Sequence, residues 1–479
     1  MKKLVYDILN KLSHPEITFA DVRLTSTDSQ WIGFETGTLK RFGSITDQIA
    51  VGVRVLINGC WGFAGTVDLS YKSIETMIQK AISNAQIGSS FKTNRVNFPP
   101  LSPTVQSYFY KPEEDPFLIS DEEKLGYLGE IAKKLTGIEK IVHSYVSTSF
   151  YRQYKIYANT EGTFTDTLVY DTLPEMVVTA SDGNDVMTRN YPGHMSARRG
   201  GFEVVRKFDF PANTERIISE AIALLSAPYI EEERADIIIG SGHLALQLHE
   251  SIGHATEADR IFGMEISYAG KTFVKPEMLG GFKYGSEIVN VYSDSTDPLG
   301  LGYHPVDDEG VPGRRVDIIK NGILVNQQTS REIAHRLGFD PSSNMIGVEA
   351  NDFPLVRMTN FCLAPGKGSL ADLIKDTEKG YFLDFTKTWS IDDNRNNFQF
   401  TTEIGWRIEN GELKNIVREP TYFGITPEFW NSCDRICGAE EWEYQGTFNC
   451  GKGEPGQALH LSHGVAPARF RNVVVNVKA

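Results

Sequence analysis

Residues 247–254 read Gln-Leu-His-Glu-Ser-Ile-Gly-His and place two imidazoles and one carboxylate within six residues. We predict a helix here because apolar side chains recur at helical spacing, at Leu244, Leu248, Ile252 and Ala255. Ser241 is predicted to cap the first turn of this helix. Residues 235–240, Ala-Asp-Ile-Ile-Ile-Gly, are predicted to form a short buried strand just before it. The expected local order is strand, tight turn and helix, with the ionisable residues in the helix.

The spacing of the two histidines departs from the familiar zinc-binding helix. In the H-E-x-x-H motif the histidines are four residues apart and lie about 40° apart around the helix axis. His249 and His254 are five residues apart, which separates them by about 140° on an ideal α-helix. We predict a π-bulge between them, made less costly by Gly253, because a bulge would bring both rings to one side. Two unrelated histidines in a core helix are the alternative, and the motif alone leaves both interpretations open.

Composition excludes several classes of protein. A chain of 479 residues with 41% hydrophobic and 23% charged residues is typical of a globular protein of two or three domains. A net charge of −14 argues against a nucleic-acid-binding protein, which would carry a basic face. The N-terminus lacks the apolar core and cleavage site of a signal peptide, and no apolar run is long enough to span a bilayer. We therefore expect a cytoplasmic protein with no membrane partner.

The cysteines do not form a disulfide framework. Five are present, an odd and sparse set for so long a chain: Cys60, Cys362, Cys433, Cys437 and Cys450. Free thiols, or a single thiolate bound to a metal, explain such a set better.

The expected fold class is α+β, with antiparallel sheets and helices layered in the N-terminal part. Asn-Gly pairs between β-rich runs predict hairpins at residues 58–59, 321–322 and 410–411. An amphipathic helix is predicted near the N-terminus on Leu4, Ile8 and Leu12. Further helices are predicted over about residues 74–82, 121–135, 213–227 and, briefly, from Ser369 to a stop at Gly380. Residues 471–477 are predicted to be a closing strand. In the C-terminal part we expect a mainly antiparallel β domain around the metal-binding helix.

Domain boundaries follow from composition. Residues 88–117 contain five prolines and are predicted to be a linker or extended connection. We predict an N-terminal α+β domain over residues 1–230, with two subdomains of about 1–95 and 118–230 that resemble an internal duplication. The acidic run 231–233 is predicted to be a solvated boundary before a C-terminal domain over residues 231–479.

A catalytic zinc site usually holds three protein ligands, so a third must come from elsewhere. His243 is predicted to lie on the surface, on the far side of the helix from His249. His304 precedes three acids at 307–309, a loop that could bind a hard cation but is more commonly solvated. Cys433 and Cys437 are spaced to share a helix face, although buried structural thiols are the commoner explanation.

Cys450 is a better candidate for the third ligand. Glycines follow it closely, and the nearby Lys452 would favour the thiolate, which is the form that binds metal. His460 and His463, on the following segment, are weaker candidates. A loop cysteine without a role is the alternative interpretation of Cys450.

Several stretches together resemble the TldD/PmbA family, whose members were once labelled modulators of DNA gyrase. These are His-Glu-Ser-Ile-Gly-His at 249–254, Asp-Asp-Glu-Gly-Val-Pro at 307–312, Arg-Met-Thr-Asn at 357–360 and Asn-Cys-Gly-Lys-Gly at 449–453. The resemblance extends to Val-Gly-Val-Arg-Val at 51–55, Trp-Gly-Phe-Ala at 61–64 and Asn-Thr-Glu-Gly at 159–162. Four motifs in order over nearly the whole chain are far more specific than the histidine motif alone.

The resemblance implies a function and a set of ligands. The family contains TldD-like subunits, which carry the H-E-x-x-x-H motif and act as metallopeptidases, and PmbA-like subunits, which lack it and serve as partners. This chain resembles the TldD-like kind. By that resemblance His249, His254 and Cys450 would hold zinc, and Glu250 would be the catalytic carboxylate. Peptides or unfolded segments would be cleaved inside a closed dimer, either a homodimer or a heterodimer with a PmbA-like paralogue.

The expected chemistry is zinc-assisted hydrolysis of amides, with Glu250 accepting a proton from water and passing it to the leaving amine. Three competing hypotheses remain at this point. The chain could be a non-catalytic partner or scaffold subunit, a DNA-associated regulator, or a non-hydrolytic metalloenzyme. The net charge of −14 speaks against the DNA-associated regulator.

Overall fold

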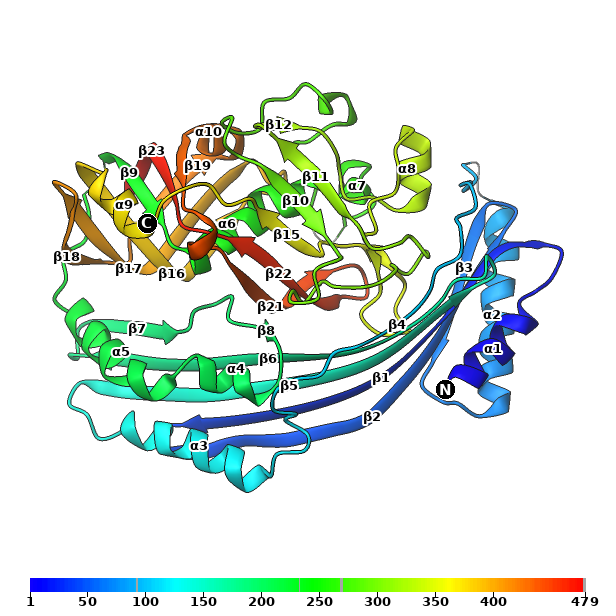
Figure 1. Ribbon diagram of the computed structural model, residues 1–479, viewed down its shortest axis with the longest axis horizontal. Helices are drawn as coiled ribbons and strands as arrows, with labels where there is room; N and C mark the ends of the chain where they lie inside the picture. Colours follow the sequence, from blue (N-terminus) through cyan, green and yellow to red (C-terminus); the bar gives the residue numbers. More distant parts are fainter. Residues whose placement is uncertain (92–93, 232, 268–269, 477–479) are drawn as a thin grey trace.

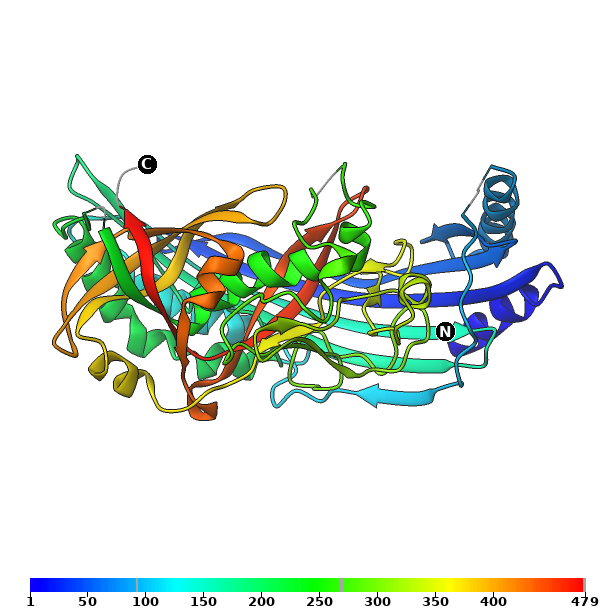
Figure 2. The same cartoon turned by 90° about the horizontal axis from the view of Figure 1, so that it is seen from above.

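The computed structural model describes residues 1–479 except 92–93, 232, 268–269 and 477–479. A long curved sheet lies beneath a second group of strands and helices formed by the C-terminal part of the chain (Figure 1). Seen from above, this C-terminal part lies along much of the long strands, and the two N-terminal helices sit beyond it at one end (Figure 2). Among the described residues, no helix is long and apolar enough to cross a membrane.

The N-terminal sheet has eight strands in the order β3-β2-β1-β5-β6-β4, with β7 and β8 also paired to β6. All of its pairs are antiparallel except β4 with β6. The strands are β1 (Ile17–Glu35), β2 (Thr38–Ile57), β3 (Cys60–Thr66), β4 (Val105–Phe109), β5 (Ile141–Asn159), β6 (Phe164–Ser181), β7 (Val186–Tyr191) and β8 (Arg198–Arg199).

Four of these strands are 18 to 20 residues long, so one sheet supports two separate helical layers. At one end α1 (Lys2–Lys11) and α2 (Tyr71–Ser89) bury apolar side chains such as Ile8 and Ile78 against β1, β2 and β5. At the other end α3 (Asp121–Lys134), α4 (Phe202–Lys207) and α5 (Phe210–Leu224) form a second core with β5, β6 and β7. Burial of apolar surface in these two cores holds the helices to the sheet.

The C-terminal part contains two larger sheets and one short strand pair. One sheet has the order β12-β11-β10-β15-β22-β21, and the other has β16-β9-β23-β19-β17-β18 with β20 on β23. Because β16 also pairs with β17, five strands of the second sheet close into a ring. The strands are β9 (Glu233–Ile239), β10 (Val291–Asp294), β11 (Arg315–Lys320), β12 (Ile323–Leu324), β13 (Met345–Ile346), β14 (Leu355–Val356), β15 (Asn360–Leu363), β16 (Lys379–Ile391), β17 (Asn397–Glu409), β18 (Glu412–Arg418), β19 (Thr421–Ile425), β20 (Cys433–Ile436), β21 (Glu443–Lys452), β22 (Gln457–Val465) and β23 (Ala468–Asn476).

Helix α6 (Ser241–Leu248) lies between these two sheets. It contacts β16 of one sheet and both β21 and β22 of the other, and Leu244 and Leu248 are fully buried. Four further short helices belong to this half: α7 (Ala258–Ile261), α8 (Arg331–Leu337), α9 (Leu370–Lys375) and α10 (Thr426–Asn431). The α+β fold class predicted from the sequence is confirmed, and the helix with the ionisable residues sits at the centre of the C-terminal core.

Most local sequence signals are confirmed. All three Asn-Gly hairpins are present, with their asparagines and glycines in the left-handed region that such turns require. Helix α1 is present where Leu4 and Ile8 predicted it, and α3 matches its predicted range. Ser369 caps α9 through a reciprocal bond with Asp372. The closing strand exists as β23. Residues 88–117 include the end of α2 and strand β4, so only part of this segment is the predicted extended connection.

Three predictions about helix ends are wrong. Helix α5 begins at Phe210 because Asp209 caps it, three residues before the predicted start. Helix α9 stops at Lys375, while Gly380 lies in β16, where a Cβ would approach the carbonyl oxygen of Asp236 to 2.3 Å. Ser241 does not cap α6 either. The carboxylate of Asp384 from β16 packs against Gly240 and accepts a bond from the backbone N–H of His243.

A buried ion pair links the two halves of the chain. Arg189 on β7 donates to Glu403 on β17 at 2.5 Å and also to Glu220 on α5 at 2.8 Å. Glu403 additionally accepts the backbone N–H of Asn190. Burial raises the pKa of the Glu403 carboxyl to about 7, although Arg189 acts in the opposite direction. The folded chain therefore holds this proton more tightly than the unfolded chain does.

Glu403→Gln is expected to change how stability depends on pH. Because its pKa is raised in the folded state, Glu403 makes its full contribution to stability below the ordinary pKa of 4.5. This contribution is lost as the pH rises through about 7. Between pH 4 and pH 8 the wild-type protein should therefore lose up to about 3 kcal/mol of unfolding free energy relative to the glutamine variant. Urea denaturation of both proteins across this range measures the difference. A constant difference would contradict the raised pKa.

The division into domains at residue 230 stays a prediction. The eight-stranded sheet uses strands between Ile17 and Arg199, and the two larger sheets of the other half begin at Glu233. The two halves are joined by side-chain contacts such as Arg189 with Glu403. Limited proteolysis near residue 230, followed by separation of the fragments, would test whether each half folds alone.

Candidate metal centre

The helix that carries the motif changes its winding at the motif itself. Helix α6 ends at Leu248, a π-helical turn covers His249–Gly253, and a 3-10 turn covers His254–Thr256. The predicted bulge between the two histidines is therefore confirmed. Gly253 has ordinary helical angles, so its conformational freedom is not what the bulge needs. A Cβ at this position would lie 2.2 Å from the sulfur of Met358, and close packing explains the glycine instead.

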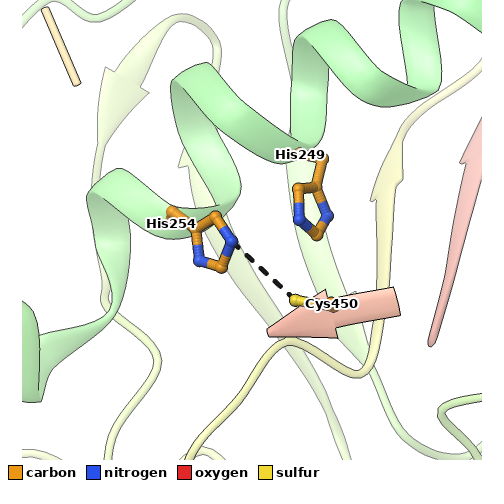
Figure 3. Close-up of side chains that lie close together, drawn as sticks. All are labelled: His249, His254 and Cys450. Carbon is orange, nitrogen blue, oxygen red and sulfur yellow. Dashed lines mark hydrogen bonds between the residues drawn. The ribbon is translucent and has the colours of Figure 1, made fainter. Parts of the chain in front are cut away.

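The bulge brings three potential ligands together. His249 and His254 point from the helix toward Cys450 on β21, as Figure 3 shows. Their ligand atoms all lie within 4.8 Å of one another, and the Cys450 sulfur is 3.8 Å from Nε2 of His254. One ion with bonds of about 2.0 Å to nitrogen and 2.3 Å to sulfur could reach all three after small side-chain adjustments. Two imidazoles and one thiolate are a donor set that suits zinc.

Cys450 lies in an environment that favours its thiolate. The side chain is only 4% exposed, and burial alone would raise its pKa. The guanidinium of Arg357 and the hydrogen bond with His254 outweigh burial, and the pKa of the thiol falls below its ordinary value. Arg357 also donates to the backbone carbonyl of Cys450, which fixes the strand at this point. A buried thiolate with this support fits a metal ligand better than a structural thiol.

The hydrogen bonds of His254 direct its free nitrogen toward the site. Nδ1 lies 2.9 Å from a carboxylate oxygen of Glu257. Because a carboxylate accepts, we assign the proton to Nδ1, which leaves Nε2 with its lone pair facing Cys450. Burial acts to raise the pKa of Glu257, but Lys452 and His254 lower it well below its ordinary value. Lys452 lies 3.3 Å from Glu257, so β21 contributes both Cys450 and the cation behind this carboxylate.

His249 is oriented by a second histidine. Its Nδ1 lies 2.8 Å from Nε2 of His463, and Nδ1 of His463 lies 2.9 Å from the carbonyl oxygen of Phe361. A carbonyl can only accept, so His463 carries its proton on Nδ1 and accepts at Nε2 from His249. Burial lowers the pKa of His463 well below its ordinary value, which keeps it neutral. His249, like His254, is left with Nε2 for a metal.

His463→Leu is expected to weaken zinc binding by roughly 10- to 100-fold, because it removes the acceptor that orients His249. The matched control is His460→Leu on the same strand, since His460 bonds to Asp171 and touches none of the three ligands. Competition with a chromogenic chelator would give both zinc affinities. Equal affinities in the two variants would show that orientation of His249 by His463 is unimportant.

Glu250 is held beside the cluster in a defined position. One carboxylate oxygen accepts from Nε1 of Trp389 at 3.2 Å, and the other accepts from Nη1 of Arg395 at 2.5 Å. Burial acts to raise the pKa of the Glu250 carboxyl. The neighbouring His249 and His254 and the guanidinium of Arg395 outweigh burial and place the pKa of Glu250 below its ordinary value. The carboxyl of Glu250 is therefore held in its ionised form.

The other histidine and acid candidates lie elsewhere. His243 is not on the surface but fully buried, where it bonds to Thr386 and Tyr422, and burial lowers its pKa to about 3. The three acids that follow His304 are not solvated. All three are buried: Asp308 pairs with Lys155 and Glu309 with Arg54 of the N-terminal sheet, while Asp307 accepts backbone N–H groups. His304 itself contacts Ser343.

Cys433 and Cys437 do not share a helix face, and the commoner explanation, that both are buried structural thiols, is confirmed. Cys433 begins strand β20 and Cys437 follows its end, and both belong to the apolar core. Residues 433–436 instead form strand β20, which pairs with β23, and the spacing of two cysteines alone does not reveal this pairing.

Sequence reasoning missed the residues that hold the site in place. Trp389 and Arg395 come from the β16–β17 hairpin, about 140 residues after Glu250, and no motif in the sequence marks them. Glu257, in contrast, could have been predicted, because it follows His254 by three residues, and side chains with this spacing on a helix can touch. That spacing was a usable signal.

Known proteins resemble this chain along most of its length. The family model for the PmbA/TldA metallopeptidase C-terminal domain matches residues 232–473, and the model for domain 1 of the same metallopeptidases matches residues 20–85. A metalloprotease of Methanocaldococcus jannaschii is 27% identical over 447 residues, covering 93% of this chain and 94% of the relative. A zinc metalloprotease TldD homologue of Saccharolobus solfataricus is 25% identical over 469 residues, covering 96% and 97%.

Solved structures share the fold. A Bacteroides thetaiotaomicron protein described as a proposed modulator of DNA gyrase superposes with a TM-score of 0.76 at 16% identity, covering 100% of this chain and 99% of that one. TldE of Thermococcus kodakarensis superposes with a TM-score of 0.68 at 18% identity, covering 100% of both chains. At such identities these likenesses establish the architecture alone.

Proposed function

Because this chain belongs to the PmbA/TldD metallopeptidase family, we propose that it is a zinc-dependent peptidase that hydrolyses peptides or unfolded protein segments. The observation that carries the proposal is the position of Glu250 within the π-helical turn. The turn places the ionised carboxylate directly after one potential ligand and brings the other potential ligand, His254, to the same side. This is the arrangement that a metallopeptidase needs for its general base.

Different residues of the chain would bind the metal, transfer the proton and position these groups. His249, His254 and Cys450 would hold the ion, which when bound would supply Lewis-acid activation of water and of the scissile carbonyl. Glu250 would take the proton from the attacking water and pass it to the leaving amine. Trp389 would hold one oxygen of this carboxylate in place, while His463 and Glu257 would keep both imidazoles in the tautomer that binds metal.

Removal of metal tests the proposal. Dialysis against a chelator should abolish cleavage of an unfolded protein such as reduced, alkylated casein, and one equivalent of Zn²⁺ should restore it. Mg²⁺ should not restore it, because a thiolate and two imidazoles are poor ligands for a hard cation. Cleavage that survives full removal of metal would refute the proposed function.

We also propose that the working form is a dimer, either of two identical chains or with a paralogue that lacks the histidine motif. Closed two-fold dimers are the commonest oligomers of soluble proteins. Mass measurement of the purified chain alone and after mixing with such a paralogue would separate the two cases. A monomer in both experiments would exclude a dimer.

A further inference from the structure

We propose that Arg395 is the residue that recognises the substrate, by binding the free carboxylate at the C-terminal end of a peptide. This inference rests on the proposed peptidase function and adds a class of substrate to it. A general base does not need a contact with an arginine, yet Glu250 has one. The guanidinium of Arg395 lies 2.5 Å from the carboxylate of Glu250, and both side chains are largely buried, with 14% and 11% exposed.

In the structure the guanidinium of Arg395 pairs with a carboxylate, that of Glu250. A guanidinium presents a planar fork of donors that matches the two oxygens of a carboxylate. In the structure Glu250 supplies those oxygens from within the chain. A substrate carboxylate that takes its place would keep Arg395 paired and release Glu250 to accept a proton from water. Substrate arrival and availability of the base would thus be linked through one ion pair.

The backbone around Arg395 is fixed, so its side chain projects from a rigid support. The turn before β17 is closed by Asp392, whose carboxylate accepts the N–H of Asn396 at 2.7 Å. The carbonyl of Arg395 accepts from the hydroxyl of Thr426, and the residue holds a left-handed φ of 59°. The carbonyl of Asp393 accepts the N–H of Lys271, which ties the turn to a neighbouring segment. A non-glycine residue stays in this conformation only where its surroundings enforce it.

The geometry of a peptide favours its C-terminal carboxylate as the group that Arg395 binds. Bond lengths of about 1.3 to 1.5 Å place the terminal carboxyl carbon within roughly 4 Å of the carbonyl carbon of the last peptide bond. A terminus held by Arg395, next to Glu250, therefore brings that bond close to the catalytic carboxylate. Trp389 adjoins the same place, is 40% exposed, and has its ring centroid 5.0 Å from that of His194. These two rings offer a surface for the side chain of the last residue.

A pair of peptides that differ only at the C-terminus tests the proposal. One ends in a free carboxylate and the other in an amide. Wild-type protein with zinc should cleave the free acid with kcat/KM roughly 10- to 100-fold higher than the amide, as expected for a charge-assisted hydrogen bond. Arg395→Gln should reduce this ratio to near one, and Arg395→Lys should keep part of it. Arg407→Gln is the matched control, because Arg407 lies on the same hairpin, pairs with Glu409 and is 41% exposed.

The alternative role of Arg395 gives a different result. If it only positions Glu250, Arg395→Gln lowers cleavage of the acid and of the amide by the same factor, and the proposal is overturned. A wild-type ratio near one also overturns it. Calorimetry with the same two peptides made from D-amino acids measures binding without cleavage. It therefore tests the role of Arg395 separately from the peptidase function. Preferential binding of the acid without cleavage of any peptide would refute the peptidase function but support the role of Arg395.

Discussion

Cys450→Ala is expected to leave the purified protein with almost no zinc. The thiolate is one of three ligand atoms that lie within 4.8 Å of one another, and the remaining two imidazoles are too few for a stable catalytic site. Loss of an orienting partner alone costs about 10- to 100-fold in metal affinity, and loss of a ligand should cost more than about 100-fold. Metal analysis by mass spectrometry, together with a chelator competition assay, gives both the content and the affinity.

A second cysteine provides the control for this experiment. Cys437 is buried in the same apolar core and touches none of the site residues, so Cys437→Ala should keep the zinc content of the wild type. Thermal unfolding of both variants without metal shows whether either has lost its fold. Full zinc retention in Cys450→Ala would remove Cys450 from the site and leave the ion with two protein ligands.

Glu250→Gln is expected to lower kcat for peptide hydrolysis by about 10²- to 10⁴-fold, the usual contribution of a general base. Glutamine keeps the shape of the side chain and can still accept the bond from Trp389, but it cannot take a proton from water. None of the proposed ligands is changed, so zinc content should stay at the level of the wild type. Steady-state kinetics and metal analysis on the same preparation test both parts.

Glu403→Gln is the matched control for this substitution. Glu403 is also a buried glutamate paired with an arginine, Arg189, but it lies at the contact between the two halves of the chain. Its glutamine variant should retain kcat. Unchanged hydrolysis by Glu250→Gln would support the competing hypothesis of a scaffold subunit, in which the metal has only a structural role.

Much of the fold and part of the site could be predicted from the sequence because their signals are local. Asn-Gly turns fix hairpins through the φ angles of two adjacent residues, and Ser369 with Asp372 starts α9 through bonds within one turn. The five-residue spacing of His249 and His254 required a bulge, and the helix contains one. The family resemblance, carried by ordered motifs along the chain, is confirmed by the two matching domain models.

Other features depend on which strands meet. Whether an acid near His304 is solvated depends on Lys155 and Arg54 of the N-terminal sheet, more than 150 residues away in the chain. The cap of α6 depends on Asp384 of β16 rather than on its own Ser241. The partners of Glu250 come from a hairpin that closes a ring of strands beside the helix. Such contacts follow from strand order, which the periodicity of a sequence does not specify.

The motif at residues 249–254 shows which features depend on the sequence alone and which depend on the tertiary structure. The sequence by itself determined the bulge between the two histidines and the position of Glu250 directly after His249, because these depend on residue type and spacing along one helix. Only the tertiary structure decided that Cys450 on β21 lies against His254, that His463 and Glu257 set the tautomers, and that Arg395 holds Glu250. The physical reason is that side chains from the helix, β21, β22 and the β16–β17 hairpin must meet within hydrogen-bonding distance, and packing alone sets that meeting.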